Sequence, residues 1–295
     1  MSFATDLENA IDYIDENLAD EIDYERAAQK ARCSVYHFQR MFSFLTGLPL
    51  SEYIRRRRMT LAAFELRSTD AKIIDIAVKY GYDTHSSFTR AFQSVQGVAP
   101  SKARMDGVSL TAYPKLSFQF KLKGASAMQF NIRRTKPYKL FGMSPVRLDG
   151  WQTEPFLKYA DEIIENGVHD AINAAAGFPG LAREMIENGA WDEKRLHLLH
   201  AVHFYDEAGS KYFMYGWECP EGGVGDEFTV LDIPDTAWVT VTASLDGERD
   251  SIKNCYEDLY VNWFPASGYN QAPGRPIIEK YDWDKCELWM PIEKN

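Results

Sequence analysis

The sequence predicts two domains, an all-α domain followed by an α+β domain, and three observations carry this prediction. The chain has 295 residues, which suits about two domains of ordinary size. Up to Met105, apolar residues recur three and four positions apart, as they do along helices. From Ser109 onward, short strand-like runs alternate with helical stretches. We therefore expect domains at residues 1–107 and 127–295, joined by a connector at residues 108–126.

The composition is that of a folded chain without a membrane span. Hydrophobic residues make up 45% and charged residues 26% of the sequence. No apolar run approaches the ~18 residues that a membrane span needs, and the acidic start has no signal-peptide pattern. Four widely spaced cysteines favour neither a zinc site nor a disulfide framework: Cys33, Cys219, Cys255 and Cys286. We expect reduced thiols, a cytoplasmic location, and no metal, cofactor or membrane partner.

The net charge of -10 conceals three segments of different sign. Residues 1–25 carry nine carboxylates and no lysine or arginine. Residues 26–104 carry fourteen basic and five acidic residues, and residues 105–295 carry nineteen basic and twenty-nine acidic residues together with all seven tryptophans. A phosphate backbone responds to a local basic patch rather than to the total charge. The middle segment is therefore the candidate nucleic-acid-binding part.

An internal repeat lies within this basic segment. The stretches Phe38–Gly47 and Phe88–Gly97 have phenylalanine, arginine, phenylalanine and glycine at the same spacing, 50 residues apart. In each copy a short helix, expected at Tyr24–Ala31 and at Ile73–Tyr80, precedes a tight break and a longer helix. This order is typical of a helix-turn-helix, so the sequence predicts two such units.

Helical geometry divides each longer helix into a core side and an outward side. Phenylalanines four residues apart form the core stripe in both copies. The outward residues include arginine, glutamine, serine and threonine, which can hydrogen-bond base edges in the major groove. The alternative, merely solvated polar positions, is weakened by the duplication. The outward residues are Tyr36, Gln39, Arg40 and Ser43 in the first copy and Ser86, Thr89, Arg90 and Gln93 in the second, where His85 lies at the start of the helix.

Between the copies, a long helix expected at Leu50–Ser68 contains four consecutive arginines. At 100° per residue they cannot share one face, so one or two should contact phosphate and the others should support the domain. The candidates for contact with the DNA backbone are Arg55, Arg57 and Arg58. A helix of ~19 residues spans ~28 Å, which is compatible with the ~34 Å between successive major grooves.

In the second domain the pattern predicts both strands and helices. Strands are expected at Leu116–Leu122, Met128–Arg133, Lys139–Val146, Leu196–Tyr205, Lys211–Glu218 and Ala237–Ala243. Helices are expected at about Glu154–Ala176, Leu181–Asn188 and Glu248–Trp263.

The strand at Cys286–Ile292 alternates in character and suggests a ligand site. Leu288, Met290 and Ile292 share one face, which should meet the helices, while Glu287 and Trp289 share the other. A carboxylate beside an indole suits a lipophilic cation, although an exposed glutamate and an indole covering an edge would give the same pattern. Further candidates for the walls of a ligand cleft, each of which can equally be core, are Trp217, Tyr256, Trp263 and Tyr281.

Residues from about 5 to 106 resemble the DNA-binding domain of the AraC/XylS family of transcription regulators. The matching stretches include Phe38-x-Arg40-x-Phe42-x4-Gly47, Ile73-x2-Ile76-Ala77-x3-Gly81-Tyr82 and Ser87-Phe88-x-Arg90-Ala91-Phe92-x4-Gly97-x2-Pro100-x3-Arg104. The resemblance implies which residues occupy the base-reading positions of the family: Tyr36, Gln39 and Arg40 in the first copy, and His85, Ser86, Thr89 and Arg90 in the second. Tyr36 departs from the tryptophan that is frequent there, and His85 and Ser86 depart from glutamines, so the target sequence does not carry over.

The C-terminal part, about residues 127–295, resembles the GyrI-like or BmrR-like effector-binding domain, which follows the DNA-binding domain as in Rob-like regulators. The matching pieces are Trp263-Phe-Pro265-x-Ser267-Gly268-Tyr269, Pro276-x2-Glu279-x-Tyr281 and Glu287-x-Trp289-x-Pro291-Ile292. The resemblance implies two pseudo-symmetric strand–helix–strand halves around a ligand cleft. The region around Val168–Trp191 finds no place in that pattern.

Three functions follow from these observations. The first is a DNA-binding transcription regulator whose second domain binds a small molecule, with a lipophilic cation as one ligand class. The second is a DNA-binding module that carries a hydrolase, since some GyrI-like domains resemble hydrolases that use a glutamate and a tyrosine. The third is a regulator whose second domain is structural or binds only a protein partner such as RNA polymerase.

Catalysis has little support in the sequence, and we expect no enzyme. There is no nucleophile–histidine–acid spacing and no glycine loop that would cradle phosphate. His197, His200 and His203 resemble a metal cluster, but they fall on an expected strand without a cysteine partner, and we interpret them as ordinary strand residues.

Overall fold

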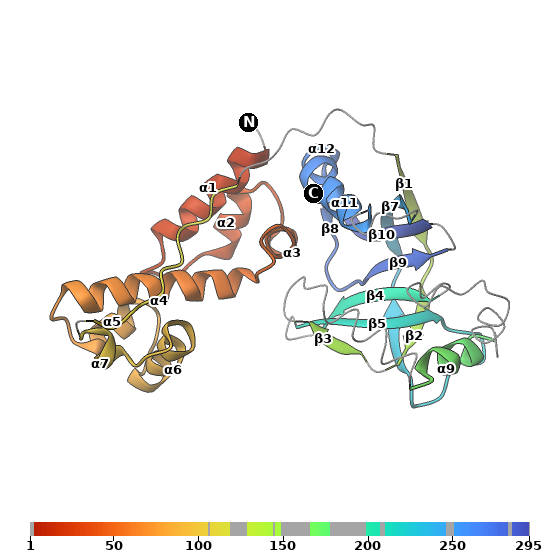
Figure 1. Ribbon diagram of the computed structural model, residues 1–295. Helices are drawn as coiled ribbons and strands as arrows, with labels where there is room; N and C mark the ends of the chain where they lie inside the picture. The colour runs from red at the N-terminus through yellow and green to blue at the C-terminus, as the bar shows by residue number, and fades with distance from the viewer. Residues whose placement is uncertain are drawn as a thin grey trace. The chain divides into compact units, whose positions relative to one another are not determined.

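The structure, a computed structural model, describes residues 3–105, 107–118, 129–143, 145–148, 166–177, 199–206, 210–245, 251–282 and 285–294. It divides into two units, Met1–Gly124 and Ala125–Asn295, which are considered separately below (Figure 1). The expected domain boundaries stay a prediction, because this division into compact units does not test them.

The first unit is helical, and its helices repeat one local design. Ser34 and Thr84 precede the two longer helices of the repeat and accept hydrogen bonds from backbone N–H groups three residues ahead, at 3.2 and 3.1 Å. Gly47 and Gly97 end the same helices in the left-handed region, with φ of 69° and 73°. The helices are α1 (Phe3–Glu16), α2 (Tyr24–Lys30), α3 (Val35–Thr46), α4 (Leu50–Ser68), α5 (Ile73–Lys79), α6 (His85–Gln96) and α7 (Pro100–Ala103).

The core of this unit has two parts on either side of α4 (Figure 1). Phe38 and Phe42 from α3 and Phe88 and Phe92 from α6 are fully buried, as their spacing predicts. Burying a phenylalanine stabilises a fold by about 1.5–3 kcal/mol, so these four rings are major contributors to the two helix-turn-helix cores. The two expected helix-turn-helix units are therefore α2–α3 and α5–α6, joined by α4.

The second unit contains one antiparallel sheet. In its described part the strand order is β1-β7-β10-β9-β4-β5-β2-β6, with β3 beside β5 and β8 beside β10. The strands are β1 (Phe130–Thr135), β2 (Tyr138–Gly142), β3 (Val146–Leu148), β4 (His200–Tyr205), β5 (Lys211–Glu218), β6 (Thr229–Ile233), β7 (Thr236–Ser244), β8 (Tyr269–Gln271), β9 (Ile277–Tyr281) and β10 (Lys285–Lys294).

The strand order confirms two pseudo-symmetric halves. In the first half β2 is followed by helix α9 (Val168–Ala175) and then by β4 and β5. In the second, β7 is followed by helix α11 (Ser251–Glu257), a π-helical continuation η1 (Asp258–Trp263) and a short α12 (Phe264–Ser267), then by β9 and β10. In each half the second strand lies at the centre of the sheet, where β4 pairs with β9, the third strand lies next to it and the first strand follows. Beyond these strands, β1 and β6 form the two edges of this strand order.

Two of the expected strands differ from the observed ones. The strand predicted at Leu116–Leu122 is wrong for its described residues, Leu116–Phe118, since the Leu116 amide donates to the side chain of Tyr53 rather than to a strand. The strand predicted at Lys139–Val146 is two strands, interrupted before Pro145, whose ring allows no ladder hydrogen bond. The helix predicted at Leu181–Asn188 and most of the one at Glu154–Ala176 lie outside the described residues.

The helices cover one face of the sheet, and the other face packs its own core. Cross-strand partners share a face. On the first face, Ile172 of α9 packs with Ala201 and Phe213, and Leu288 is fully buried. On the second face, Ile278 and Trp289 belong to a separate core cluster. The expectation that the Leu288 face of its strand meets the helices agrees with this arrangement.

Candidate DNA-reading helices and small-molecule site

The outward side of α6 is open to solvent. His85, Ser86 and Arg90 are exposed and Thr89 is half-buried. The Thr89 hydroxyl lies 3.4 Å from His85 Nδ1, which links two of these side chains one helical turn apart. Because Phe88 and Phe92 hold the opposite side in the core, these four residues are presented to solvent on the other side of α6.

The corresponding residues of α3 lie away from its buried phenylalanines. The guanidinium carbon of Arg40 lies 5.1 Å from the centroid of the Tyr36 ring, a cation–π distance. Gln39 precedes Arg40 on the same side of the helix. The two helices thus place their predicted base-reading residues at equivalent positions of equivalent helices, and the base-reading roles themselves stay predictions.

The four arginines of α4 are engaged within the first unit. Arg55 and Arg56 both pair with Glu52 at 2.6 Å, and Arg55 also donates to Ser94 of α6. Arg57 pairs with Asp15 of α1 at 2.6 Å, with only 13% of its side chain exposed. Arg58 donates to backbone carbonyls of residues 18 and 20. These contacts join parts of the first unit to one another. They do not test the predicted contacts of Arg55, Arg57 and Arg58 with phosphate.

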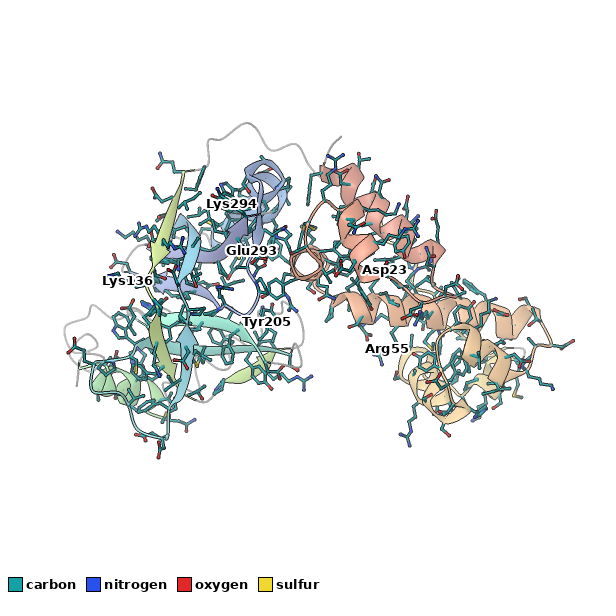
Figure 2. The ribbon with its side chains drawn as sticks, turned by 180° about the vertical axis from the view of Figure 1, so that it is seen from behind. Asp23, Arg55, Lys136, Tyr205, Glu293 and Lys294 are labelled. Carbon is teal, nitrogen blue, oxygen red and sulfur yellow. The ribbon has the colours of Figure 1, made fainter. Side chains whose placement is uncertain are left out.

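Arg55 is more exposed than Arg57 among the residues predicted to bind the DNA backbone. Its side chain is 41% exposed, and Figure 2 shows it on α4. A partly exposed guanidinium can exchange a surface carboxylate for a phosphate at little cost, since surface ion pairs contribute about 0–1 kcal/mol. Arg57 would have to give up a largely buried pair.

A buried carboxylate, Glu279, lies at the centre of the helix-covered face of the second unit. Its oxygens accept hydrogen bonds from the hydroxyls of Tyr256 at 2.8 Å and Tyr281 at 2.6 Å, and His203 Nε2 lies 3.2 Å away. Glu279 is 7% exposed, Tyr256 3% and His203 2%. The three partners come from α11, β9 and β4, so this Glu279 cluster joins both halves of the unit. Lys211 of β5, which is also buried, acts electrostatically on His203.

The environment fixes the charge of each member of the Glu279 cluster. Burial alone would raise the pKa of Glu279, but His203 and the two tyrosine hydroxyls hold the pKa of this carboxyl below its ordinary value. Burial and the adjacent carboxylate raise the pKa of Tyr256 and of Tyr281 well above the usual range. Burial lowers the pKa of His203 despite Glu279. At neutral pH the cluster therefore contains an ionised glutamate and two neutral tyrosines.

Glu287 and Trp289 lie on the opposite face of the sheet from Glu279. Glu287 pairs in register with Lys280, the residue after Glu279, and neighbouring residues of a strand face opposite sides. Its carboxylate accepts from Trp289 Nε1 at 2.7 Å and pairs with Arg133 at 2.9 Å. The Lys280 ammonium lies 4.2 Å from the centroid of the Trp289 ring. The predicted proximity of Glu287 and Trp289 is observed, and their ligand role stays a prediction.

The remaining predicted wall residues divide between two places. Tyr256 and Tyr281 contact Glu279, and Trp217 packs against the same hydrophobic cluster as Tyr281. Trp263 lies elsewhere, buried on η1 and stacked on Tyr269 at a centroid distance of 5.8 Å. Sequence reasoning named neither Glu279 nor His203 as a ligand residue. The signal was a carboxylate that directly follows Ile277 and Ile278, inside a stretch already quoted for the family resemblance.

Together, the fold and its two candidate sites define a DNA-binding transcription regulator that carries a small-molecule-binding domain. Residues 27–106 match a helix-turn-helix domain family, and residues 177–293 match the GyrI-like small molecule binding domain. The chain belongs to the AraC/XylS family of transcription regulators, with the DNA-binding domain first and the GyrI-like domain second, as the sequence predicts.

Curated relatives match the first unit. The HTH-type transcriptional activator AarP of Providencia stuartii is 41% identical over 93 residues, which are 32% of this chain and 69% of AarP. The regulatory protein SoxS of Salmonella typhimurium is 38% identical over 104 residues, 35% of this chain and 97% of SoxS. Among solved structures, SAV2435 bound to tetraphenylphosphonium is 12% identical with a TM-score of 0.40, covering 56% of this chain and 94% of that one.

Two features are absent from the part of the chain that the structure describes. No helix in these parts of the chain is both long and apolar enough to cross a membrane. Within the same residues, no group of three or more histidine, cysteine, aspartate or glutamate side chains is placed to hold a metal ion.

Proposed function

We propose that this regulator binds duplex DNA by placing α3 and α6 in two successive major grooves. The observation that carries the proposal is the equivalence of the two helices, which share their cap residues, their terminal glycine and their buried phenylalanines. Equivalent helices present equivalent faces to DNA. The proposed base-reading residues are Tyr36, Gln39 and Arg40 on α3, and His85, Ser86, Thr89 and Arg90 on α6. Arg55, Arg57 and Arg58 are the proposed phosphate contacts.

Salt dependence and footprinting test this proposal on the full chain. A protein that neutralises six to ten phosphates loses about 10³–10⁵ in affinity between 50 and 200 mM salt, and the +9 segment should act in this way. Arg40→Ala and Arg90→Ala should relax specificity at positions ~10 base pairs apart. Footprints in which both substitutions relax the same base pairs would refute reading of two grooves.

We further propose that the small molecule binds against the Glu279 cluster. An ionised carboxylate with tyrosine rings beside it attracts a lipophilic cation, because the ring faces and the charge favour the same sign. Trp217 is a proposed wall of this site. Such a ligand would replace some of the donors that now satisfy Glu279, so binding couples directly to the position of Tyr256 on α11.

Thermal shift measurements distinguish the charge of the ligand and its site. The full chain and Glu279→Gln should be melted with a tetraarylphosphonium cation and with a neutral triarylphosphine oxide of similar size. A shift with the cation alone that disappears in Glu279→Gln supports the proposal. Equal shifts in both proteins would remove Glu279 from the site.

The second candidate function is hydrolysis, because the structure brings a glutamate and two tyrosines together. We favour binding without catalysis, since the curated relatives are transcription regulators and these tyrosines stay protonated at neutral pH. Incubation of the full chain with a panel of aryl esters and epoxides checks this choice. Turnover that is lost in both Glu279→Gln and Tyr256→Phe would support the hydrolase instead.

One protein partner and one cellular location belong to the same proposal. A transcription activator that binds DNA beside a promoter contacts RNA polymerase, and AarP is named as an activator. Co-sedimentation of the chain with RNA polymerase on promoter DNA tests this contact. The proposed DNA target also implies that the chain acts in the cytoplasm.

A further inference from the structure

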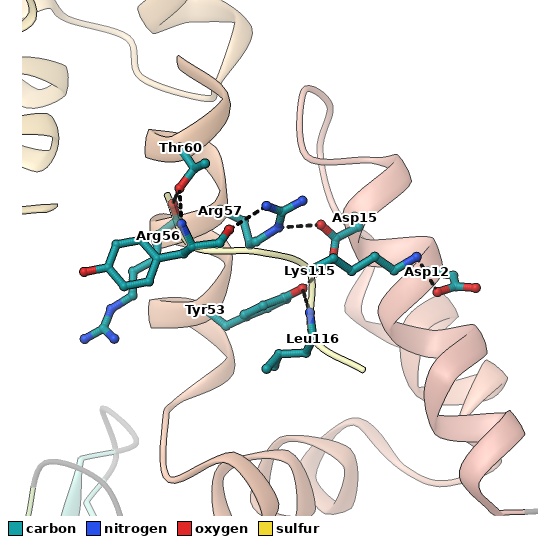
Figure 3. Close-up of polar contacts among 9 residues, drawn as sticks. Asp12, Asp15, Tyr53, Arg56, Arg57, Thr60, Lys115 and Leu116 are labelled. Carbon is teal, nitrogen blue, oxygen red and sulfur yellow. Dashed lines mark hydrogen bonds and ion pairs between the residues drawn. The ribbon is translucent and has the colours of Figure 1, made fainter. Parts of the chain in front are cut away.

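The segment that follows α7, residues 108–116, is an extended strap along α4 (Figure 3). Its first contacts are with α6. Gln96, the last residue of that helix, donates from Nε2 to the carbonyl of Thr111 and accepts from its N–H, both at 2.8 Å. Leu110 packs against the core formed by α4, α5 and α6. The start of the strap is thus attached to the second helix-turn-helix unit.

The middle of the strap is attached to α4. The Tyr113 N–H donates to Thr60 Oγ1 at 3.0 Å, and the Tyr113 carbonyl accepts from Arg57 Nη1 at 2.6 Å (Figure 3). The guanidinium of Arg56 lies 5.1 Å from the centroid of the Tyr113 ring. Both backbone groups of Tyr113 are therefore satisfied by side chains of one helix.

The end of the strap reaches α1. The Leu116 N–H donates to the Tyr53 hydroxyl at 3.3 Å, and that hydroxyl donates in turn to Asp15 of α1. Lys115 pairs with Asp12, also on α1, at 2.6 Å (Figure 3). Along nine residues the strap therefore contacts the second helix-turn-helix unit, the connecting helix and the helix that precedes the first unit.

We infer that the strap fixes the angle between the two reading helices, and that Gln96 and Thr60 are positioning residues for DNA recognition. The inference rests on the proposed reading of two grooves by α3 and α6. Helix α4 is the element on which both helix-turn-helix units pack, and long helices bend. A bend of ~20° spread along a helix of ~28 Å moves one end by ~5 Å, which exceeds the ~3.4 Å between base pairs. A second connection alongside α4 opposes that bend.

Burial separates this role from direct contact with DNA. Gln96 is 6% exposed and Thr60 is 1% exposed, and their polar atoms bond to backbone groups of the chain itself. Any effect of these side chains on DNA recognition must therefore pass through the position of α6. The strap is also the last described segment before the chain enters the second unit.

The test compares the full chain with a variant whose strap is released. Gln96→Met with Thr60→Val keeps the shape of both side chains and removes three hydrogen bonds to the strap. Thr69→Val is the matched control, because Thr69 also donates to the carbonyl four residues earlier and accepts one backbone N–H, but bonds within the α4–α5 turn. The probe is duplex DNA selected by the wild-type chain from a random library, with and without one base pair inserted between its two half-sites.

We expect the insertion to weaken binding by at least about tenfold for the wild type and for Thr69→Val, but by less than about threefold for the strap variant. Hydrogen exchange should show loss of protection at the Thr111 and Tyr113 amides in the strap variant alone. Gln96→Met by itself serves where the double variant does not fold.

Two results overturn the inference, and they are distinguishable. A folded strap variant that keeps the full wild-type penalty shows that the strap does not position α6. A wild-type chain that binds the selected DNA without any spacing penalty refutes two-groove reading itself, and the role of the strap with it.

Discussion

The outward side of α6 and the Glu279 cluster are both candidate functional sites, and they are built in opposite ways. On α6 the polar residues face solvent while Phe88 and Phe92 hold the helix in place. At Glu279 the polar groups are themselves buried and bond to one another across α11, β4 and β9. Stability and function are therefore separable on α6 and inseparable at Glu279. Substitutions in the two places should have different signatures.

The largest effect is expected for Glu279→Ala. Removal of this carboxylate leaves the hydroxyls of Tyr256 and Tyr281 and the imidazole of His203 buried without their acceptor. Breaking a buried charged network by deleting one partner costs about 3–5 kcal/mol. Urea unfolding followed by tryptophan fluorescence measures this loss in the second unit, because all seven tryptophans lie between Trp151 and Trp289.

Circular dichroism at 222 nm in the same experiment serves as the control for Glu279→Ala, since the first unit contributes most of the helix among the described residues. The unfolding transition of the first unit should have the same urea midpoint as in the wild type. A loss below about 1 kcal/mol in the fluorescence transition would show that the Glu279 cluster does not hold the two halves together.

The next largest effect is expected for Arg90→Ala, and it should act on DNA binding alone. A bidentate contact between arginine and guanine contributes about 1–3 kcal/mol to discrimination between bases. Because Arg90 is exposed, the free energy of unfolding should change by less than about 0.5 kcal/mol. Arg90→Lys separates base reading from phosphate contact, since lysine keeps the charge without the planar fork. Restoration of full specific affinity by lysine would move Arg90 to the phosphate contacts.

Much of the first unit could be predicted from the sequence because its signals are local. A period of 3.6 with Phe38, Phe42, Phe88 and Phe92 on one side determines both the helices and the side that faces outward. The repeat supplied a second, independent copy of the same evidence. The contacts of the strap could not be predicted, because Gln96 and Thr111 meet through tertiary packing that no local pattern records.

The site of the second unit was only partly predictable for a related reason. Alternation on a strand shows which residues share a face, and it placed Glu287 beside Trp289 correctly. It does not show which face of the sheet the helices cover, or that a polar cluster forms beneath them. Glu279 depends on His203, 76 positions earlier on β4, and on Tyr256 of α11, so its burial becomes evident only when the central pairing of β4 with β9 is known.

A smaller effect is expected from pH, and His203 is its main source within the Glu279 cluster. Burial lowers the pKa of His203 in the folded chain, so between that value and the ordinary ~6.5 the unfolded chain binds the extra proton. Stability of the second unit is therefore fully present above pH ~6.5 and falls as the pH decreases. One proton contributes a slope of at most about 1.4 kcal/mol per pH unit.

His203→Gln provides the check on this source. The substitution should reduce the slope of the unfolding free energy against pH, between pH 6 and pH 5, by up to one proton. A slope of the same sign remains from His200, because burial and Lys280 lower the pKa of its imidazole to about 3. Lys211 and Glu279 also face His203, and the lowered pKa of Glu279 keeps that carboxyl ionised in this window. Identical slopes in the wild type and in His203→Gln would show that His203 does not titrate in this way.

The smallest effect is expected for Glu287→Gln, and it decides which carboxylate the ligand meets. Glu287 pairs with Arg133, and these side chains are 25% and 48% exposed, so the pair contributes little in solvent. Glutamine still offers an oxygen to Trp289 Nε1, and unfolding should change by less than about 0.5 kcal/mol. The thermal shift with a tetraarylphosphonium cation should then equal that of the wild type, whereas Glu279→Gln should abolish it. The reverse pattern, a shift lost in Glu287→Gln and kept in Glu279→Gln, would move the ligand to the opposite face of the sheet. There the indole of Trp289, now approached by Lys280 and Arg133, would have to exchange those cations for the ligand.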